Sequence, residues 1–403
     1  MSGLPEAFAR LEAACAAGGP AAMLAALAAS LAARKRWHAL FDVRLMEARL
    51  ALGLPVAGGP GVVPPDVQDR LDERSLAACR EVGWPLLDEG QIAAAWMYLR
   101  AAADPGAVAA RLEAVAARAL AGDPHEEQAA RLLEEIVGLA LWEGVDPRLG
   151  IAIMLRTHGT CNAITAYEQA VSRLPAARQE PAARLLVEHL HGELRTALAA
   201  DLRGRGLPDI PADPAPIGDL LAAAGHAADL GIHVDVSHLQ SVLRIARVCT
   251  DPETIALAWE LAVYGCRLPV EAVYPGEPPF TDVAAASRLF FGAQIGRDVE
   301  EAVRFFRRAA VEAGDDAGTL PHDVLVLLLW RLGRPAEAVH AAVDRPRDDG
   351  LPSLLRSAGM LPSLVELAAA GGDWEPLERA CVARGDEVTY AAALAARRSV
   401  KQP

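Results

Sequence analysis

Apolar residues recur every three or four positions along nearly the whole chain, which is the period of an amphipathic α-helix. One such series, with charged residues between its members, is Phe41, Leu45, Ala48 and Leu52. Alternation of the kind found in β-strands is almost absent, and its best example is the five-residue stretch 232–236. We therefore predict an all-α protein with roughly eighteen helices joined by short turns.

The composition supports helices and excludes several other classes of protein. Hydrophobic residues make up 52% of the chain and aromatic residues only 5%. Alanine and leucine are strong helix formers, whereas a β-sandwich requires more β-branched and aromatic residues. Six cysteines in 403 residues exclude a disulfide scaffold. Because these cysteines are scattered and form no Cys-x-x-Cys pair, they are typical of reduced thiols in the cytosol.

Several turns of the predicted helices share one design. A glycine ends one helix, where it adopts a left-handed conformation without steric penalty, and a small or apolar residue follows five or six positions later. The glycine and the later residue are Gly90 and Ala95, Gly296 and Ala302, Gly333 and Ala338, and Gly372 and Leu377. The last three glycines are 37 residues (296 to 333) and 39 residues (333 to 372) apart. Such a period indicates a helical repeat.

These turns resemble the junction between the two helices of a tetratricopeptide (TPR) repeat. The resemblance covers the C-terminal part from Gly296 onward and one unit near Gly90. The chain departs from the family in its longer period, and most units lack the Trp and Leu-Gly pattern of the first helix. The resemblance implies stacked antiparallel helical hairpins that form an α-α superhelix, a TPR-like solenoid. It also implies a concave surface for a protein or peptide partner.

A proline-rich segment, residues 204–216, interrupts the helical pattern with four prolines in 13 residues. Proline disrupts the interior of a helix, so this segment is the predicted domain boundary, either as a linker or as a loop that crosses the stack. It separates an N-terminal helical array, residues 1–203, from C-terminal TPR-like hairpins, residues 217–403. Residues 54–65 and 268–280 are two further irregular segments, and Phe280 and Tyr274 are expected to hold the second one in place.

The charge of the chain disfavours binding to nucleic acid. The formal net charge is −14, and an acidic surface repels phosphate backbones. The basic run 34–36 is interpreted as the solvated end of a helix, with contact to nucleic acid or lipid head groups as the alternative. The N-terminus lacks a signal-peptide pattern, and the longest strongly apolar run, 324–330, is too short to cross a bilayer. We expect a cytoplasmic protein without a nucleic-acid or membrane partner.

The usual motifs of nucleotide-binding proteins, zinc proteases and serine hydrolases are absent, so we predict no cofactor. One polar segment, residues 156–168, nevertheless separates two predicted helices. Gly159 would close the first helix and Thr160 would cap the second. Cys161 would then lie in a first helical turn, where the helix dipole and a protonated His158 stabilise a thiolate. Three neighbouring polar residues are candidate binding residues: Arg156, Asn162 and Thr165. The alternative is a tight turn whose polar groups satisfy the helix ends.

A second candidate site is the pair His189 and Glu193, which lie one helical turn apart. We place both at the border of an apolar stripe, and we place His191 outside it. The stripe is formed by Leu186, Leu190, Leu194 and Ala197. A partly buried ionisable pair suggests acid–base or ligand-binding chemistry, and a plain hydrogen bond between two helices is the alternative. His158, Cys161, His189 and Glu193 are acceptable zinc ligands, but without closely spaced cysteines we predict no metal site.

The remaining candidates are aromatic residues and histidines. Trp96 and Tyr98 are candidate binding residues, with packing between helices as the alternative, and the same alternatives apply to the pairs 290–291 and 305–306. Three histidines, at positions 226, 233 and 238, are given no role, and Ser237 is predicted to cap the helix that contains the last of them.

Two functions follow from this sequence. The first is a non-catalytic interaction or scaffold module for a protein or peptide, because the turns repeat and catalytic motifs are missing. The alternative is an all-α enzyme or small-molecule-binding protein. Its pocket would contain the residues His158, Cys161, Asn162, Thr165, His189 and Glu193.

Overall fold

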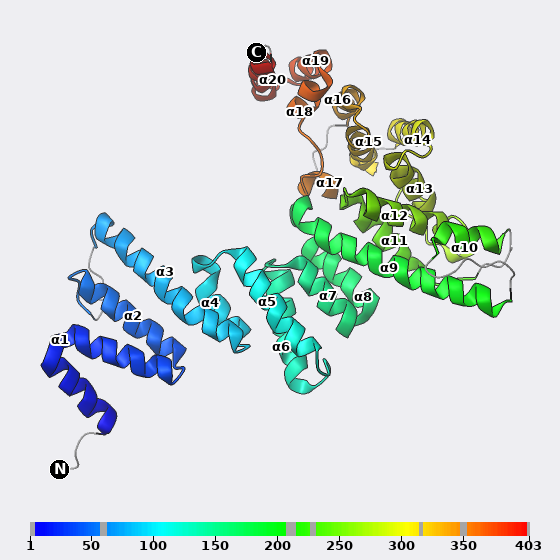
Figure 1. Ribbon diagram of the computed structural model, residues 1–403. Coiled ribbons are helices and arrows are strands. Elements are labelled where there is room, and N and C mark those ends of the chain that lie inside the picture. The colour runs from blue at the N-terminus through cyan, green and yellow to red at the C-terminus, as the bar shows by residue number, and fades with distance from the viewer. Residues whose placement is uncertain are drawn as a thin grey trace. The chain divides into compact units, whose positions relative to one another are not determined.

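The computed structural model describes residues 5–56, 63–206, 215–225, 231–313, 317–346 and 353–400. These residues form twenty α-helices, close to the roughly eighteen expected, and none of them forms a strand (Figure 1). The stretch 232–236, which alternates like a strand, has no regular structure before a helix begins at Val236. The prediction of an all-α protein is therefore confirmed.

The chain divides into two compact units, residues 1–150 and residues 151–403. The helices of the first unit are α1 (Glu6–Ala33), α2 (Trp37–Ala51), α3 (Pro65–Asp88), α4 (Ile92–Ala102), α5 (Pro105–Leu120), α6 (Glu127–Val137) and the π-helical turn η1 (Gly138–Trp142). Helix α7 (Pro147–Thr157) spans the boundary. Within this unit α1 packs against α2, α2 against α3 and α3 against α4, and α6 packs against both α4 and α5. Their apolar faces meet in a core that includes Leu24, Leu40 and Val82.

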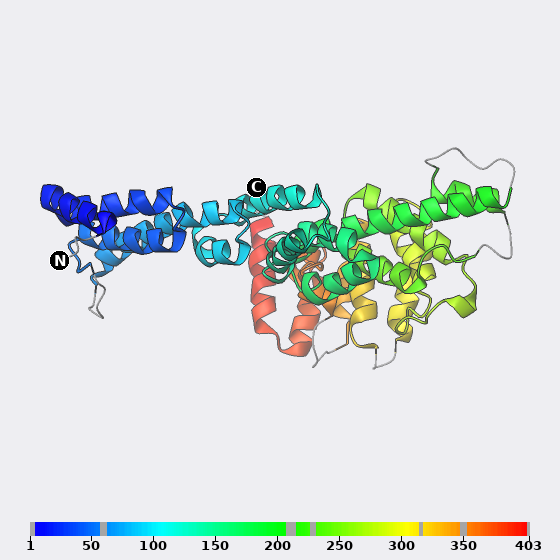
Figure 2. The ribbon, with the colours of Figure 1, turned by 90° about the horizontal axis from the view of Figure 1, so that it is seen from below.

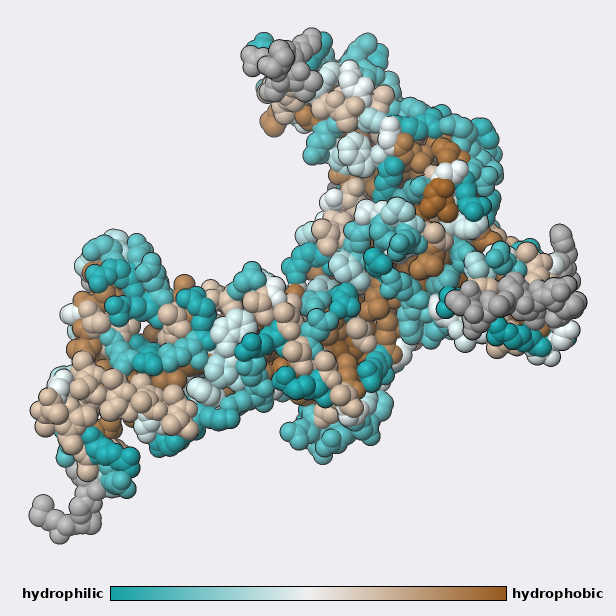
Figure 3. Space-filling view, in the orientation of Figure 1, coloured by the Kyte–Doolittle hydropathy of each residue, from teal (hydrophilic) through white to brown (hydrophobic). Residues whose placement is uncertain are grey.

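The first helix of this unit carries an unusually apolar surface. By length and composition α1 is the one helix among the described residues that is apolar enough to cross a membrane. Gly18 and Gly19 depart from helical dihedral angles, however, and divide it into two shorter helices. Most of its surface is weakly hydrophobic, as the tan colour of this region shows (Figure 3). This composition is also found in core helices of soluble proteins.

The second unit is built around the long helix α9. Its elements are α8 (Gly159–Ala166), η2 (Tyr167–Val171), α9 (Ala176–Gly204), α10 (Ile217–Ala224), α11 (Val236–Ile245), η3 (Ala246–Val248), α12 (Pro252–Gly265), η4 (Val270–Ala272), α13 (Val283–Gln294), α14 (Val299–Glu312), α15 (Leu320–Arg331), α16 (Pro335–Val343), α17 (Leu354–Ser357), α18 (Leu364–Gly371), α19 (Glu375–Arg384) and α20 (Glu387–Val400). Helix α9 packs against α10, α11 and α12, and the later helices follow one another from α12 to α16 (Figure 2). Among the two aromatic pairs, Phe290, Phe291 and Phe306 are buried between these later helices and Phe305 is half-buried, which confirms that they serve packing.

The glycine turns have the geometry that the sequence predicts. All four glycines have positive φ angles, between 68° and 81°. After three of them the chain closes with a bond typical of a helix C-terminus, for example from the Arg334 N–H to the Leu329 carbonyl. The small or apolar residues that follow are completely buried: Ala95, Ala302, Ala338 and Leu377, each 0% exposed. A short side chain at this position lets the next helix approach closely.

The predicted boundary at 204–216 lies inside the second unit. Helix α9 ends at Gly204, and α10, which follows the segment, packs back onto α9 and α12. The segment thus lies between two helices of one unit, while the division between the units falls at 150/151. Residues 207–214, which include most of the prolines of this segment, lie outside the described residues.

The irregular segment 268–280 is held in place at Phe280, which is buried. The Tyr274 side chain is exposed, and the Tyr274 carbonyl accepts a hydrogen bond from Gln240.

Candidate functional site

The polar segment after α7 forms a tight turn between two helices. Helix α7 ends at Thr157, and Gly159 has a φ of 81°, which lets the chain reverse into α8. The His158 imidazole Nδ1 lies 2.7 Å from the Thr157 hydroxyl. Cys161 is an exposed free thiol in the first turn of α8, as predicted. Among the described contacts, the His158 side chain therefore meets Thr157, its neighbour in the chain, and not Cys161.

Thr160 does not cap α8, contrary to our prediction. The N-cap position belongs to His158, which makes no capping bond with its side chain. The Thr160 hydroxyl instead lies 3.0 Å from His189 Nε2 and 3.4 Å from a Glu193 carboxylate oxygen, both on α9. The positive φ of Gly159 rotates the start of α8 so that this hydroxyl faces α9. The two polar segments of the sequence therefore do converge, through a residue that we had assigned to a cap.

The geometry at His189 differs from that of a catalytic relay. His189 Nε2 is 3.2 Å from Glu193 Oε1, and the same nitrogen faces the Thr160 hydroxyl. A hydroxyl–imidazole–carboxylate relay needs the hydroxyl on one ring nitrogen and the carboxylate on the other. Here both partners share one nitrogen, so the carboxylate does not orient the ring for proton transfer. The His189 and Glu193 side chains are 31% and 46% exposed, which leaves the cluster open to solvent.

The other predicted binding residues lie outside this cluster. Asn162 and Thr165 are exposed and return their side-chain hydrogen bonds to the backbone of their own helix, at the carbonyls of residues 158 and 161. Arg156 is exposed near the end of α7. In the first unit the Tyr98 hydroxyl lies 2.7 Å from His38 Nδ1, and its ring packs on Phe41. Trp96, on the same helix, buries its indole nitrogen without a hydrogen-bond partner among the described residues.

His191, which we placed outside the apolar stripe of α9, is in fact buried. It is 6% exposed, and its Nε2 lies 2.7 Å from Glu260 on α12. The prediction was wrong because α9 is covered by several helices, so that its buried face is wider than a single stripe and includes Leu198 in place of Ala197. Burial alone would raise the pKa of Glu260, but hydrogen bonds from His191 and from the Ile217 N–H lower it.

An open groove runs along the exposed face of α9. It has a volume of about 830 Å³ and lies between this face and the segment that leads into α11. From α9 its polar lining consists of Glu188, His189, Glu193 and Arg195. From the segment before and within α11 it consists of His233, Asp235 and His238. Three carboxylates, one guanidinium and three imidazoles therefore face one surface.

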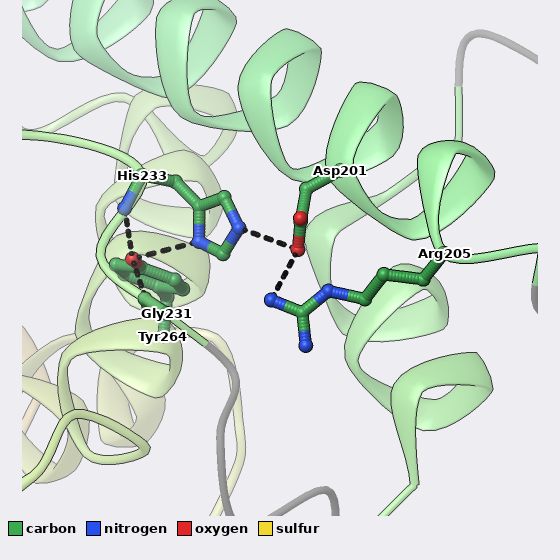
Figure 4. A network of polar contacts seen from close by, with 5 residues as sticks. All are labelled: Asp201, Arg205, Gly231, His233 and Tyr264. Carbon is green, nitrogen blue, oxygen red and sulfur yellow. Dashed lines mark hydrogen bonds and ion pairs between the residues drawn. The ribbon is translucent and has the colours of Figure 1, made fainter.

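One end of this groove is anchored by a polar network around the buried side chains of His233 and Tyr264 (Figure 4). His233 Nε2 lies 3.1 Å from Asp201 Oδ2, and His233 Nδ1 lies 3.1 Å from the Tyr264 hydroxyl. The His233 backbone N–H also donates to this hydroxyl, over 2.9 Å. Arg205, one turn after Asp201 on α9, pairs with the same carboxylate at 2.8 Å. Arg205 first, and then His233, lowers the pKa of Asp201.

This network is connected like a catalytic hydroxyl–imidazole–carboxylate relay, but its hydroxyl is not accessible to a substrate. Its carboxylate and hydroxyl occupy different nitrogens of His233, as proton transfer requires. Tyr264, however, is completely buried. Burial raises the pKa of Tyr264, an effect that the hydrogen bond from the His233 backbone only partly offsets. No substrate reaches a phenol in this position, so the network ties α9, α12 and the segment at 231–235 together.

Sequence reasoning missed this network because its members lie far apart in the chain. Its one local sign is the polar residue Tyr264 in the otherwise apolar last turn of α12. The start of α11 also differs from our prediction, since Asp235 and not Ser237 is the N-cap. The Asp235 carboxylate accepts hydrogen bonds from the N–H groups of Ser237 and His238. His226 lies outside the described residues.

The described residues hold no group of three or more His, Cys, Asp or Glu side chains placed to bind a metal ion. His189 and Glu193 by themselves make too few ligands for a zinc site. No protein-family model matches the chain, and no curated protein or solved structure shows significant similarity to it. The site must therefore be interpreted from its own geometry.

Proposed function

We propose that this chain is a non-catalytic interaction module of the helical-repeat type, with a TPR-like stack of hairpins in its second unit. Support comes from the four glycine turns, from the buried small residues that follow them and from the packing of successive helices. Helices of this length bury their apolar faces by stacking on neighbours, which leaves extended surfaces open to partners.

The observation that carries this proposal is the open groove along α9. A small-molecule active site is commonly a closed, mostly apolar pocket with a few placed polar groups. This groove is wide, its lining carries seven ionisable or imidazole side chains, and His189 lacks the geometry of a general base. Its features fit a segment of another protein better than a reacting small molecule. The enzyme alternative receives less support, because Cys161 and His158 do not pair.

The charges of the groove select the class of partner. Glu188, Glu193 and Asp235 provide three negative charges, and Arg195 provides one positive charge. Glu188 also forms an ion pair with Arg184 at 2.7 Å, and both side chains are exposed. With neutral imidazoles the excess is negative, so we propose that the partner is an extended segment rich in Arg or Lys. We further propose a cytoplasmic location, because all six cysteines, each among the described residues, are free thiols.

Peptide binding measured by fluorescence anisotropy tests this function. A labelled peptide of alternating Arg and Ala should bind the wild type, its Glu-Ala counterpart should not, and added salt should weaken binding. The variant Glu188→Gln/Glu193→Gln should bind at least about tenfold more weakly, because it removes two of the three carboxylates. The matched control, Glu301→Gln/Glu387→Gln, changes the net charge equally at exposed positions on α14 and α20 and should bind like the wild type.

A second pocket lined by carboxylates, in the first unit, provides a further control for this test. Glu126, Glu127 and Glu135 line it together with Arg131. The variant Glu126→Gln/Glu127→Gln should therefore retain the basic peptide. If this variant loses binding while the α9 variant keeps it, the groove is not the binding site. Equal binding of the basic and acidic peptides would contradict the interaction module as proposed.

A further inference from the structure

The second unit contains another cavity, separate in its lining from the groove along α9. Its volume is about 320 Å³, at the lower end of the range for ligand sites. Elements distant in sequence meet around it: η2, α9, α11, η3 and α17. Its apolar wall comes mainly from Ile245, Val248, Leu354, Leu355 and Met360.

The polar groups of this cavity divide into satisfied and unsatisfied ones. The buried pair Tyr167 and Gln179 is satisfied, because the Tyr167 hydroxyl donates to Gln179, whose amide donates to the carbonyls of residues 172 and 174. The Ser172 hydroxyl likewise donates to a backbone carbonyl. Arg244 contacts only the Ser241 hydroxyl, at 3.2 Å, among the hydrogen bonds of the described residues.

Arg247, in the wall of this cavity, has no counter-ion among the residues that the structure describes. Its guanidinium carbon lies 6.0 Å from the centre of the Phe280 ring. In the described part of the chain it makes no ion pair with a carboxylate, and Glu277 acts on it only from a distance. Burial, and then the charge of Arg244, lowers the pKa of Arg247 to about 10. Arg247 is half-buried, and a partly desolvated charge without a partner is costly, so an anion in the cavity would be stabilised by it.

The charged groups and the apolar wall of the cavity together specify the kind of anion. The lining carries two guanidinium groups, Arg244 and Arg247, and one carboxylate, Glu168. One positive charge remains, which matches an anion with a single charge. A carboxylate suits the planar donor groups of arginine. The apolar wall needs a ligand whose remaining part is hydrophobic.

We propose that this cavity binds a small monocarboxylate with an apolar body, with the carboxylate held by Arg247 and Arg244 and the body against Leu354, Leu355 and Met360. The site is independent of the groove along α9 and goes beyond the interaction function. Occupation would join α17 to η3 and α11, so that the ligand would also stabilise the second unit.

Calorimetric titration with octanoate, and with octanamide as its neutral counterpart, tests the proposal. Octanoate should bind at millimolar concentration or below, and octanamide at least about tenfold more weakly, because it lacks the charge. The variant Arg247→Gln should lose octanoate binding by a similar factor, and Arg247→Lys should lose less. The matched control Arg308→Gln removes an exposed cation from α14 and should bind like the wild type.

A second variant keeps the test decisive if Arg247→Gln does not fold. Leu354 lines the cavity but is 69% exposed, so Leu354→Trp should fold and obstruct the site. It should weaken octanoate binding and abolish the rise in melting temperature that octanoate gives the wild type. Absence of octanoate binding, equal affinity for octanamide, or unchanged binding by both Arg247→Gln and Leu354→Trp would overturn the proposal. Because these readouts do not involve the basic peptide, their failure is distinguishable from failure of the interaction function.

Discussion

Two clusters along α9 contain the same chemical groups and differ in what surrounds them. Near its middle, Thr160, His189 and Glu193 form a partly exposed cluster in which one imidazole nitrogen meets both partners. Toward its C-terminal end, Asp201, His233 and Tyr264 form a second cluster in which each nitrogen has its own partner. We call it the buried cluster because the Tyr264 and His233 side chains are 0% and 7% exposed, whereas Asp201 is 30% exposed. A hydroxyl, an imidazole and a carboxylate in contact therefore do not by themselves indicate catalysis.

The difference between these clusters assigns them different roles. In the buried cluster the Tyr264 hydroxyl and the His233 imidazole must find partners, since an unsatisfied group away from water costs about 1–3 kcal/mol. In the exposed cluster water replaces any lost partner, so the side chains are free to contact another molecule. We therefore expect the buried cluster to determine stability and the exposed cluster to determine binding.

The largest effect should follow from removal of Tyr264. The variant Tyr264→Ala should lower the free energy of unfolding by about 4 kcal/mol, because it leaves a cavity in the core. Tyr264→Phe retains the ring and removes only the hydroxyl, so the His233 N–H and imidazole lose a partner, at a cost of about 1–3 kcal/mol. Urea denaturation followed by circular dichroism measures both. A cost below about 0.5 kcal/mol for Tyr264→Phe would show that water replaces the hydroxyl and that the network is not buried.

A second effect concerns the buried pair of His191 and Glu260, and it depends on pH. Because the pKa of Glu260 is lowered in the folded protein, its stabilising contribution is complete above the pKa of about 4.3 for the unfolded chain. It is lost as the pH falls through the lower folded pKa. The variant Glu260→Gln should be less stable than the wild type by about 2 kcal/mol at pH 7.

The difference between Glu260→Gln and the wild type should shrink as the pH is lowered from about 5 to about 3. Urea denaturation at a series of pH values measures it, with Glu301→Gln, an exposed glutamate on α14, as the control. A difference that stays constant over this range would show that Glu260 acts by packing and not by its charge.

A smaller effect is expected at the exposed cluster. Thr160→Val removes the hydroxyl that joins α8 to α9 and should cost less than about 1 kcal/mol, since solvent-exposed pairs contribute little. The same change should leave binding of the basic peptide intact, because the carboxylates of the groove remain. A loss of stability comparable to that of Tyr264→Phe would erase the contrast between the two clusters.

The smallest effect is expected for His158 and Cys161, which the sequence indicated as the first candidate site. His158→Ala and Cys161→Ala change exposed side chains of a turn, and each should alter the free energy of unfolding by no more than about 0.5 kcal/mol. Neither should change peptide affinity. A bound metabolite that is present in the wild type and lost in either variant would instead support the enzyme alternative.

The sequence predicted the features that depend on neighbouring residues. Gly90, Gly296, Gly333 and Gly372 have positive φ angles as expected, because only glycine adopts this conformation freely. A small or apolar residue follows each of these turns in the sequence, and the structure shows that all four of these residues are completely buried. His189 and Glu193 were correctly placed one turn apart.

Burial on α9 was harder to predict, because it depends on how many helices cover it. His191 and His189 are two residues apart; His189 is partly exposed, as its predicted place at the border implies, whereas His191, which was placed outside, is buried. The partners of His233 and Thr160 were also out of reach, since Tyr264 and Glu193 approach them only after helices distant in the chain have packed.

The order of apolar and polar residues alone determined that this protein is all-helical and where glycine turns its chain, because hydrogen bonding and backbone geometry act within a few residues. Tertiary structure alone decided which histidines are buried, which carboxylates line a groove and which arginines line a cavity. These properties depend on the low-dielectric surroundings that other helices create, and a pattern of nearby residues does not contain that information.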